Sequence, residues 1–588
     1  MNAHPIIEQS LDLLKTYQWG KLWKGVRTVT LQTPTSDNFP LKVKQQLLAI
    51  KAMLLSSWWQ SPHLIDEILT FLDSAQTDPL VHFSCRYALL AKGDLPALKA
   101  LEKRQPTKMP LWMREWLKLE YLGRSLQSQK QIQLIRSLIQ KHNQLPDWAA
   151  VALLQSLDHH QADIQPLKTL INDQAWLHAT QTHPLILALG VRIQSLSVYD
   201  AMAHMANIDP NRLQTTDALC QSDLLDTLKP NLFNIIGYRL ANRLFVDKRL
   251  NEALYVMDAL APSRFIDMTS IQKWLVLSTS LPQGLAGLDK RVAFAMQCAP
   301  DDLISQGTLA SYGLIGTWLK GEIKQSYEWV KTYHAYQDLP TTEINKNAQI
   351  FFRYVLSLCV AWQHNGNLFE HDPLVAQHQG YAPLWVLGES HSLTLSHLKL
   401  QFHQQRLIGQ VGFIMGVKMY HLAQTDKSYH DVLFQTQLNQ VPDHAHFLLT
   451  IGEIDTRPDE GIWKNSYHKQ KPYEPVVDAT VTGYINYLKQ TLKDKTFASI
   501  TIQGIPAPNY PFKDAKDPID TPQFLAMIRY TNAQLKHHTL NAGFQFLDVY
   551  AATLDETTGK SHGQHHIDGY HLSPVFYQHA SDWLVKPA

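Results

Sequence analysis

The sequence predicts a chain of two parts, an all-α N-terminal part followed by a C-terminal α/β domain. Glycine usage is the first indication, because residues 1–370 contain 13 glycines and residues 371–588 contain the other 13. The first part has leucine and alanine at spacings of three and four, which is typical of helices. The last third alternates short apolar runs with helical patterns, which favours a parallel sheet with helices on both faces.

Length and composition fit this division. At about 150 residues per domain, 588 residues leave room for two to four domains. Hydrophobic residues make up 45% and charged residues 18%, as in ordinary globular proteins, so a wholly disordered, collagen-like or coiled-coil chain is excluded. The formal net charge is +1, so no net basic field exists to hold nucleic acid or an anionic membrane.

Three further features favour a cytoplasmic protein. Residues 1–21 lack the basic segment and apolar core of a secretory signal, and the chain has no run of 18 apolar residues that would predict a transmembrane helix. The four cysteines are too far apart for a disulfide framework or a CxxC metal site, so we expect buried thiols. These cysteines are Cys85, Cys220, Cys298 and Cys359.

The N-terminal part, residues 1–365, is expected to consist of helical hairpins. An array of helix pairs buries its apolar faces by stacking neighbours, which predicts an α-solenoid-like domain. A non-repetitive helical bundle is the alternative. The hairpins are expected at residues 86–104, 240–262 and 316–333, with turns at Gly93, Asp247 and Gly321, and residues 351–362 would open another.

The hairpin around Asn251-Glu252-Ala253-Leu254 resembles tetratricopeptide-type (TPR-like) repeats, although the repeat period is irregular. This resemblance implies a concave surface that binds a protein partner or a long substrate.

Residues 366–382 are polar and lose the helical periodicity, which predicts a linker before an α/β domain at residues 383–588. Strands are expected at residues 383–389, 408–416, 446–452, 498–506 and 543–550, and helices at 392–405, 476–492, 524–540 and 575–585.

Reactive side chains follow the expected strands. Ser390 follows the first strand, whereas Asp568 and His571 follow the last one. Active residues gather at the carboxyl ends of parallel strands, so we expect these three side chains to lie together. Nucleophilic acyl transfer needs this set, in which the imidazole takes the hydroxyl proton and the carboxylate holds the imidazole. The alternatives are a serine that caps a turn and a buried histidine bonded to a carbonyl.

The sequence Leu387-Gly388-Glu389-Ser390, together with Asp568-x-x-His571-Leu572, resembles the SGNH (GDSL-type) hydrolase superfamily. The resemblance covers residues 383–588. It implies a three-layer α/β/α flavodoxin-like fold, with Ser390 as nucleophile and Asp568 and His571 as acid and base. Glu389 stands where the family has aspartate, a residue that supports the turn.

The resemblance also implies an oxyanion hole, formed in the family by the N–H of the nucleophile, a glycine N–H and an asparagine side chain. In this chain the resemblance implies that the N–H groups of Ser390 and Gly416 form the oxyanion hole, and Gly412 is the second candidate for the glycine. Ile454 replaces the asparagine, and losing one such donor typically costs a factor of about 10²–10³ in rate.

Arg457 is a candidate replacement for the missing donor. Alternatively, Glu453 or Asp455 holds the loop and Arg457 binds an anionic group of the substrate. All three residues are candidate substrate-binding residues. This Gly-Glu-x-Asp-x-Arg block resembles a divergent branch found in bacterial proteins of surface-polysaccharide modification, some of them fused to TPR-like repeats.

A zinc site is a competing interpretation of the C-terminal histidines, but they lie in a glycine-containing loop without cysteines, so we expect histidines at the rim of an active site. The sequence contains neither a phosphate-binding glycine loop nor a dinucleotide fingerprint, and no cofactor is implied. The histidines are His562, His565, His566 and His571.

These features predict a serine esterase or deacylase that removes O-acyl groups, such as acetyl, from a carbohydrate or glycan. O-acyl transfer to a glycan is one alternative, and a non-catalytic binding scaffold is another. Because His571 must be neutral to act as a base, activity should fall as the pH drops through about 6.5.

Overall fold

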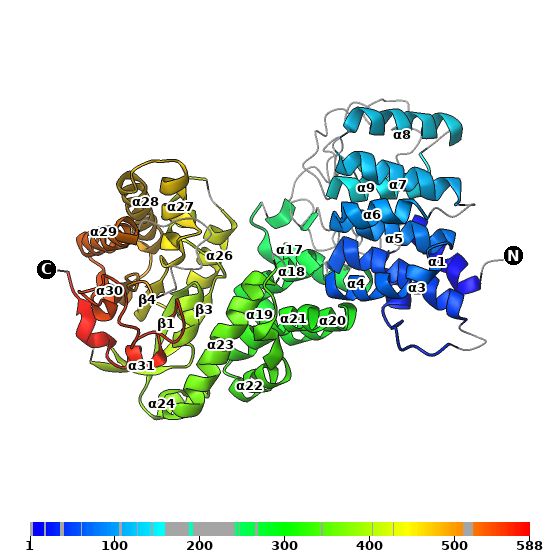
Figure 1. Ribbon diagram of the computed structural model, residues 1–588. Helices are drawn as coiled ribbons and strands as arrows, with labels where there is room; N and C mark the ends of the chain where they lie inside the picture. Colours follow the sequence, from blue (N-terminus) through cyan, green and yellow to red (C-terminus); the bar gives the residue numbers. More distant parts are fainter. Residues whose placement is uncertain are drawn as a thin grey trace. The chain divides into compact units, whose positions relative to one another are not determined.

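The computed structural model describes residues 4–158 and 240–587 apart from short gaps, of which 510–520 is the longest, and a few residues between 187 and 201 (Figure 1). The chain divides into two compact units. The first comprises Met1–Trp274 and Phe294–Gln306, and the second comprises Leu275–Ala293 and Gly307–Ala588.

The described part of the first unit is helical. Its hairpin at residues 86–104 is confirmed, because helix α5 ends at Gly93, where the backbone has a φ of +75°, and Asp94 then caps helix α6 by accepting the Ala97 N–H. The helices are α1 (Pro5–Lys15), α2 (Trp19–Val26), α3 (Leu41–Leu54), α4 (Pro62–Phe71), α5 (Pro79–Lys92), α6 (Leu95–Glu102), α7 (Leu111–Arg124), α8 (Ser128–His142), α9 (Asp147–Asp158) and α17 (Leu250–Arg264), with the π-helical turn η1 (Leu55–Trp59) and the 3₁₀ turn η2 (Asp73–Ala75).

The other two expected hairpins are also confirmed. The chain turns at Asp247 before α17. It turns again at Gly321, where φ is +76°, between α21 (Leu303–Leu319) and α22 (Ile323–Thr332). Cys85 and Cys359 are buried and Cys298 is half-buried, all as free thiols, whereas Cys220 lies outside the described residues.

Seven strands of the second unit form one mixed sheet in the order β2-β3-β1-β4-β5-β6-β7 across the described residues. The five central strands are parallel, and β2 and β7 pair antiparallel at the edges. All five expected strands are present, with bounds shifted by a few residues. The strands are β1 (Ala382–Gly388), β2 (Lys399–Phe402), β3 (Gln405–Phe413), β4 (Ala445–Thr450), β5 (Phe497–Gln503), β6 (Gln545–Leu547) and β7 (Leu584–Val585).

The two edge strands correct the sequence prediction. The helix expected at 392–405 is instead the 3₁₀ turn η7 (Ser390–Leu395) followed by β2, in which Leu400 and Phe402 are buried and Gln401 is exposed. This alternation has the period of two of a strand. The helix expected at 575–585 is divided into α31 (Pro574–Tyr577), the 3₁₀ turn η10 (Ala580–Trp583) and β7.

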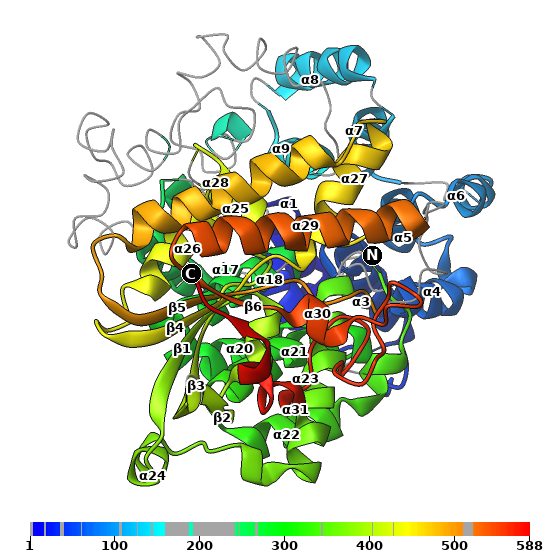
Figure 2. The ribbon, with the colours of Figure 1, turned by 90° about the vertical axis from the view of Figure 1, so that its left-hand side faces the viewer.

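Helices lie on both faces of the sheet (Figure 2). Helices α26, α28 and α29 lie on one face, and α21, α23 and α31 lie on the other. The helices expected at 476–492 and 524–540 are confirmed as α28 and α29. The bounds are α18 (Met268–Ser280), α19 (Pro282–Ala286), α20 (Leu288–Cys298), α21 (Leu303–Leu319), α22 (Ile323–Thr332), α23 (Lys346–His364), α24 (Pro373–His378), α25 (Met419–Ala423), α26 (Tyr429–Leu438), α27 (Gly461–His468), α28 (Glu474–Leu492), α29 (Thr521–Asn541) and α30 (Val549–Thr553), with 3₁₀ turns η5 (His334–Asp338), η6 (Gly366–Leu368) and η8 (Ile454–Thr456).

Helices α21 and α23 share one hydrophobic core with the sheet. Val355 and Leu358 of α23 belong to the same buried cluster as Leu384 and Val386 of β1. The unit that contains the sheet therefore begins well before residues 366–382, the segment that the sequence predicts as a linker. None of the helices that the structure describes has the length and apolar character needed to cross a membrane.

Candidate active site

The turn after β1 places Ser390 at the carboxyl end of the sheet. Gly388 ends the strand beside Thr450 of β4, and a Cβ atom at Gly388 would lie 2.0 Å from the Thr450 side-chain oxygen, so only glycine fits there. The carboxylate of Glu389 accepts the His391 N–H and caps η7, which begins at Ser390. The strand end and the turn together fix the position of the serine.

Asp568 and His571 lie in the loop between α30 and α31. Asp568 Oδ1 accepts the N–H groups of Tyr570 and His571, both at 2.7 Å, which folds this loop into a tight turn. Oδ2 of the same carboxylate lies 2.7 Å from His571 Nδ1. Burial alone would raise the pKa of Asp568, but His571 and the two N–H donors hold it well below its usual range.

The structure brings the three predicted catalytic side chains together. His571 Nε2 lies 2.9 Å from Ser390 Oγ, and the imidazole is held from its other nitrogen by Asp568. Ser390 is 5% exposed and His571 is 1% exposed. A neutral imidazole with its Nδ1 proton directed at a carboxylate presents the Nε2 lone pair to the serine hydroxyl, as nucleophilic catalysis requires.

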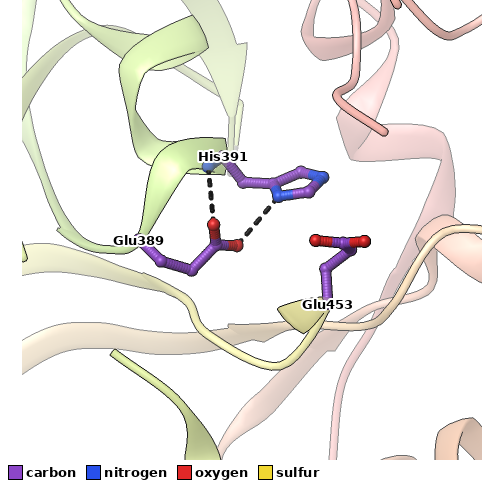
Figure 3. Close-up of side chains that lie close together, drawn as sticks. All are labelled: Glu389, His391 and Glu453. Carbon is purple, nitrogen blue, oxygen red and sulfur yellow. Dashed lines mark hydrogen bonds and ion pairs between the residues drawn. The ribbon is translucent and has the colours of Figure 1, made fainter. Parts of the chain in front are cut away.

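Glu389 adds a second carboxylate to the site. Its Oε2 lies 2.5 Å from Ser390 Oγ. Its Oε1 lies 2.8 Å from His391 Nδ1 (Figure 3). The other nitrogen of His391 lies 3.2 Å from the Tyr570 carbonyl oxygen. Both ring nitrogens of His391 therefore face acceptors, and the ring can donate to both only as an imidazolium.

Glu389 and His391 form a buried ion pair. Burial opposes both charges, yet the pKa of Glu389 is lowered to about 2, mainly by His391, and the pKa of His391 is raised by Glu389. Such a carboxylate is a poor proton acceptor at neutral pH. Of the two groups within hydrogen-bond distance of the Ser390 hydroxyl, His571 is the one suited to act as its base.

Glu389, His391 and Glu453 also lie close enough together to be considered as metal ligands, with one ligand atom from each within 4.8 Å of the others (Figure 3). The atoms that would bind a metal already form hydrogen bonds and ion pairs within the protein. Both oxygens of Glu453 accept hydrogen bonds from Arg457, the shortest at 2.6 Å from Nη2. The two carboxylates are balanced by His391 and Arg457, so the chemistry of this set fits an ion-pair network rather than a metal centre.

The four C-terminal histidines do not converge on a point within the described part of the loop. His562 Nε2 lies 3.0 Å from the Ala552 carbonyl oxygen, and His566 Nδ1 lies 3.0 Å from the Ser561 hydroxyl. The rings of His562 and His565 contact each other edge to face, and His571 belongs to the catalytic group.

Asp455 and Arg457, two predicted substrate ligands, are directed at the protein itself. The Asp455 carboxylate accepts the N–H groups of Met419 and Tyr420, at 2.8 and 3.1 Å, and so caps α25. Burial raises the pKa of Asp455 to about 7. Arg457 binds Glu453 and lies over the Tyr570 ring at 4.7 Å. The contacts of Asp455 and Glu453 match the alternative in which these two carboxylates hold the loop.

The two glycines considered for the oxyanion hole differ in position. Gly412 lies within β3, where it pairs with Leu387 of β1. Gly416 lies in the loop that follows β3, with a φ of +71° and open space where a Cβ atom would be. Ile454, in the position expected for asparagine, is buried in η8. Gly416, which lies outside the paired strands, therefore remains the first candidate of the two.

One residue of the site is absent from the sequence prediction. Tyr354 of α23 stacks on the His571 ring, with ring centroids 3.6 Å apart and ring planes 13° apart. Nothing in the local sequence indicates this contact, because Tyr354 lies in a helix assigned to the N-terminal part and far along the chain from His571. The helical periodicity of residues 351–362 shows only that one face is buried.

A search of protein-family models and a search of curated proteins both find no match to this chain, so the inference of function rests on the residues of the site.

Proposed function

We propose that this chain is a serine hydrolase of the SGNH type that removes O-acyl groups from a carbohydrate or glycan. The observation that carries the proposal is the continuous contact from Asp568 through His571 to Ser390, at 2.7 and 2.9 Å, beside the carboxyl end of β1. The acylated glycan as substrate comes from the resemblance of the sequence blocks.

The strand order supports the SGNH-type fold. Across the sheet, the five parallel strands lie in the order β3-β1-β4-β5-β6. If these strands are numbered along the chain, the order is 2-1-3-4-5, which is the flavodoxin-like order. From β1 the chain adds β3 on one side of the sheet, and it then adds β4, β5 and β6 on the other side. The switch point is therefore between β1 and β4. Ser390 follows β1 and Glu453 follows β4, so the site lies at the switch point where such sheets bind their ligands.

In the proposed reaction, His571 takes the Ser390 proton while Ser390 Oγ attacks the acyl carbonyl carbon. Asp568 keeps the Nδ1 proton in place and stabilises the imidazolium. The imidazolium then protonates the leaving sugar oxygen, and an acyl-serine remains. Water attacks this ester with His571 again as base, which releases the carboxylic acid and restores the serine hydroxyl.

The oxyanion of the tetrahedral intermediate needs hydrogen-bond donors. The N–H groups of Ser390 and Gly416 are the candidates, since Ile454 offers no side-chain donor and the Arg457 guanidinium is bound to Glu453. Two donors in place of three predict a slower enzyme than a family member with asparagine, by a factor of about 10²–10³. The helical first unit would bind a partner or a long glycan, as its TPR-like resemblance implies.

Hydrolysis of p-nitrophenyl acetate tests the proposal. The wild-type protein should release nitrophenolate, and Ser390→Ala and His571→Gln should reduce the rate to that of buffer. Ser581→Ala is the matched control, because Ser581 is an exposed serine of η10 whose hydroxyl bonds the Gln401 carbonyl oxygen. A Ser390→Ala protein with the wild-type rate would rule out the serine mechanism.

A further inference from the structure

We propose that Tyr354 of α23 is a positioning residue of this active site, and that the catalytic centre is therefore completed by a helix outside residues 383–588. The inference rests on the proposed serine-hydrolase function, because it assigns Tyr354 a role in that reaction.

The first support is the ring contact. At a centroid distance of 3.6 Å and an angle of 13°, the phenol ring covers one face of the His571 imidazole. Tyr354 is fully buried. A buried, closely stacked ring prevents the imidazole from turning about its side-chain bonds, and thus keeps Nε2 directed at Ser390.

The second support is the Tyr354 hydroxyl, which lies 2.5 Å from Thr394 Oγ1. Thr394 Oγ1 in turn donates its hydrogen to the Leu572 carbonyl oxygen at 3.0 Å. Thr394 has one hydroxyl proton, so Tyr354 must be the donor in its bond to Thr394. Burial raises the pKa of Tyr354 well above 10, so this donor keeps its proton.

These contacts connect both halves of the catalytic group. Thr394 lies in η7, four residues after Ser390, and Leu572 directly follows His571. A single tyrosine thus packs on the base and anchors the two segments that carry the base and the nucleophile. Trp318 of α21 adds a bond from its indole N–H to the Leu393 carbonyl oxygen at 2.9 Å, which fixes the same turn.

The chemical consequence concerns the transition state. When His571 takes the serine proton it becomes an imidazolium, and the face of an aromatic ring attracts such a cation. In a desolvated site this attraction would stabilise the transition state enough to raise the reaction rate about 30-fold. Because Tyr354 is fully buried against His571, its loss should lower the rate of reaction at the serine without weakening the binding of the ester.

The test measures the rate of Ser390 labelling by a fluorophosphonate in three tyrosine variants of the full chain. Tyr354→Leu removes the ring and should slow the labelling step about 10- to 30-fold, with the half-saturating probe concentration unchanged. Tyr354→Phe keeps the ring and should stay within about fivefold of wild type. Tyr336→Leu is the matched control, since Tyr336 is equally buried in the same core but bonds Thr308 instead, and its labelling rate should be that of wild type.

Two outcomes would overturn the proposal. One is a folded Tyr354→Leu protein that labels at the wild-type rate, and the other is a Tyr354→Phe protein as slow as Tyr354→Leu. If Tyr354→Leu does not fold, Tyr354→Met fills the space with a flexible chain and replaces it in the same comparison.

A second measurement separates this inference from the proposed function. The proton between His571 Nδ1 and Asp568 should give a low-field ¹H NMR resonance that His571→Gln abolishes. The resonance should persist in Tyr354→Phe and broaden or disappear in Tyr354→Leu. If wild type fails to label, the proposed function fails, whereas the NMR comparison still decides whether Tyr354 positions His571. An unchanged resonance in Tyr354→Leu would contradict the inference alone.

Discussion

At the residue scale, the site contains more buried charge than a serine, a histidine and one carboxylate require. Glu389 is paired with His391, and Glu453 is paired with Arg457. Two carboxylates and two cations balance, which is how buried charges are tolerated in a protein interior. This network surrounds the turn that carries Ser390, so the same contacts that neutralise the charges also fix the nucleophile.

Replacing Asp568 with asparagine should reduce the rate of serine labelling by roughly 10³–10⁴. The amide cannot hold the Nδ1 proton of His571, so the imidazole loses the tautomer that directs its lone pair at Ser390. The measurement is the labelling rate on protein whose circular dichroism matches wild type. The control is Asp555→Asn, which changes a half-buried aspartate of the same loop whose carboxylate accepts the Thr557 N–H. A labelling rate for Asp568→Asn within tenfold of wild type would contradict the role of Asp568.

Glu389→Gln should destabilise the fold by about 3–5 kcal/mol, because it leaves the buried charge of His391 without its partner. Glu389 has a lowered pKa, so its contribution is present above pH 4.5 and is lost as the pH falls towards 2. His391 has a raised pKa, so its contribution is present below pH 6.5 and is lost above the raised value. Urea unfolding should therefore show the largest difference from wild type between about pH 4.5 and 6.5, and an equal difference at pH 2.5 would contradict the ion pair.

At the element scale, three loops at the carboxyl edge of the sheet hold one another. The loop after β4 provides Asp455, which caps α25 in the segment after β3, and the Ile414 N–H bonds the Gly388 carbonyl oxygen at 2.9 Å. Gly416 lies in the segment between these two contacts. Asp455, which the sequence presents as a substrate ligand, thus contacts the backbone at the start of α25.

Asp455 should make the wild-type protein less stable as the pH rises from about 4 to 7. Burial raises its pKa from 3.8 to about 7, so in this range the folded state binds a proton that the unfolded state has lost. Urea unfolding of wild type and Asp455→Asn tests this effect. The stability of wild type relative to Asp455→Asn should decline across the range, and a difference independent of pH would contradict the raised pKa.

Much of the element pattern could be predicted from the sequence, because it depends on local chemistry. The parallel strands are apolar runs, and the turns at Gly93 and Gly321 need a left-handed backbone that glycine adopts readily. The helix predicted at 392–405 was wrong, since pairing with β3 decides the structure of β2. The leucines at 393, 395, 398 and 400 show which residues are apolar, but they cannot reveal that pairing.

At the scale of the whole molecule, the sheet and helices α21 to α23 form one unit. The sequences of these helices have the same apolar periodicity as the helices before them, so the sequence analysis assigns them to the N-terminal domain. Periodicity shows that a helix buries one face, but not which partner covers it. Ser390, Asp568 and His571 could be predicted from the order and spacing of the motifs along the chain. Tyr354 could not, because its partner across the core is not indicated by the periodicity of its helix.

A fragment of residues 383–588 should therefore fail to fold cooperatively. It would expose the core face of the sheet, including Leu384, Val386 and Phe413, which α21 and α23 cover in the whole chain. A fragment of residues 275–588 keeps those helices and should unfold cooperatively in urea. A cooperative transition in the shorter fragment with the full labelling rate would contradict both the shared core and the role of Tyr354.

The most direct test of the central claim is fluorophosphonate labelling of the full chain, measured by intact mass, for wild type and Ser390→Ala. The geometry of Ser390 and His571 predicts one adduct on wild type and none on Ser390→Ala. A folded wild-type protein without an adduct, or an equal adduct on Ser390→Ala, would contradict an activated serine at this position.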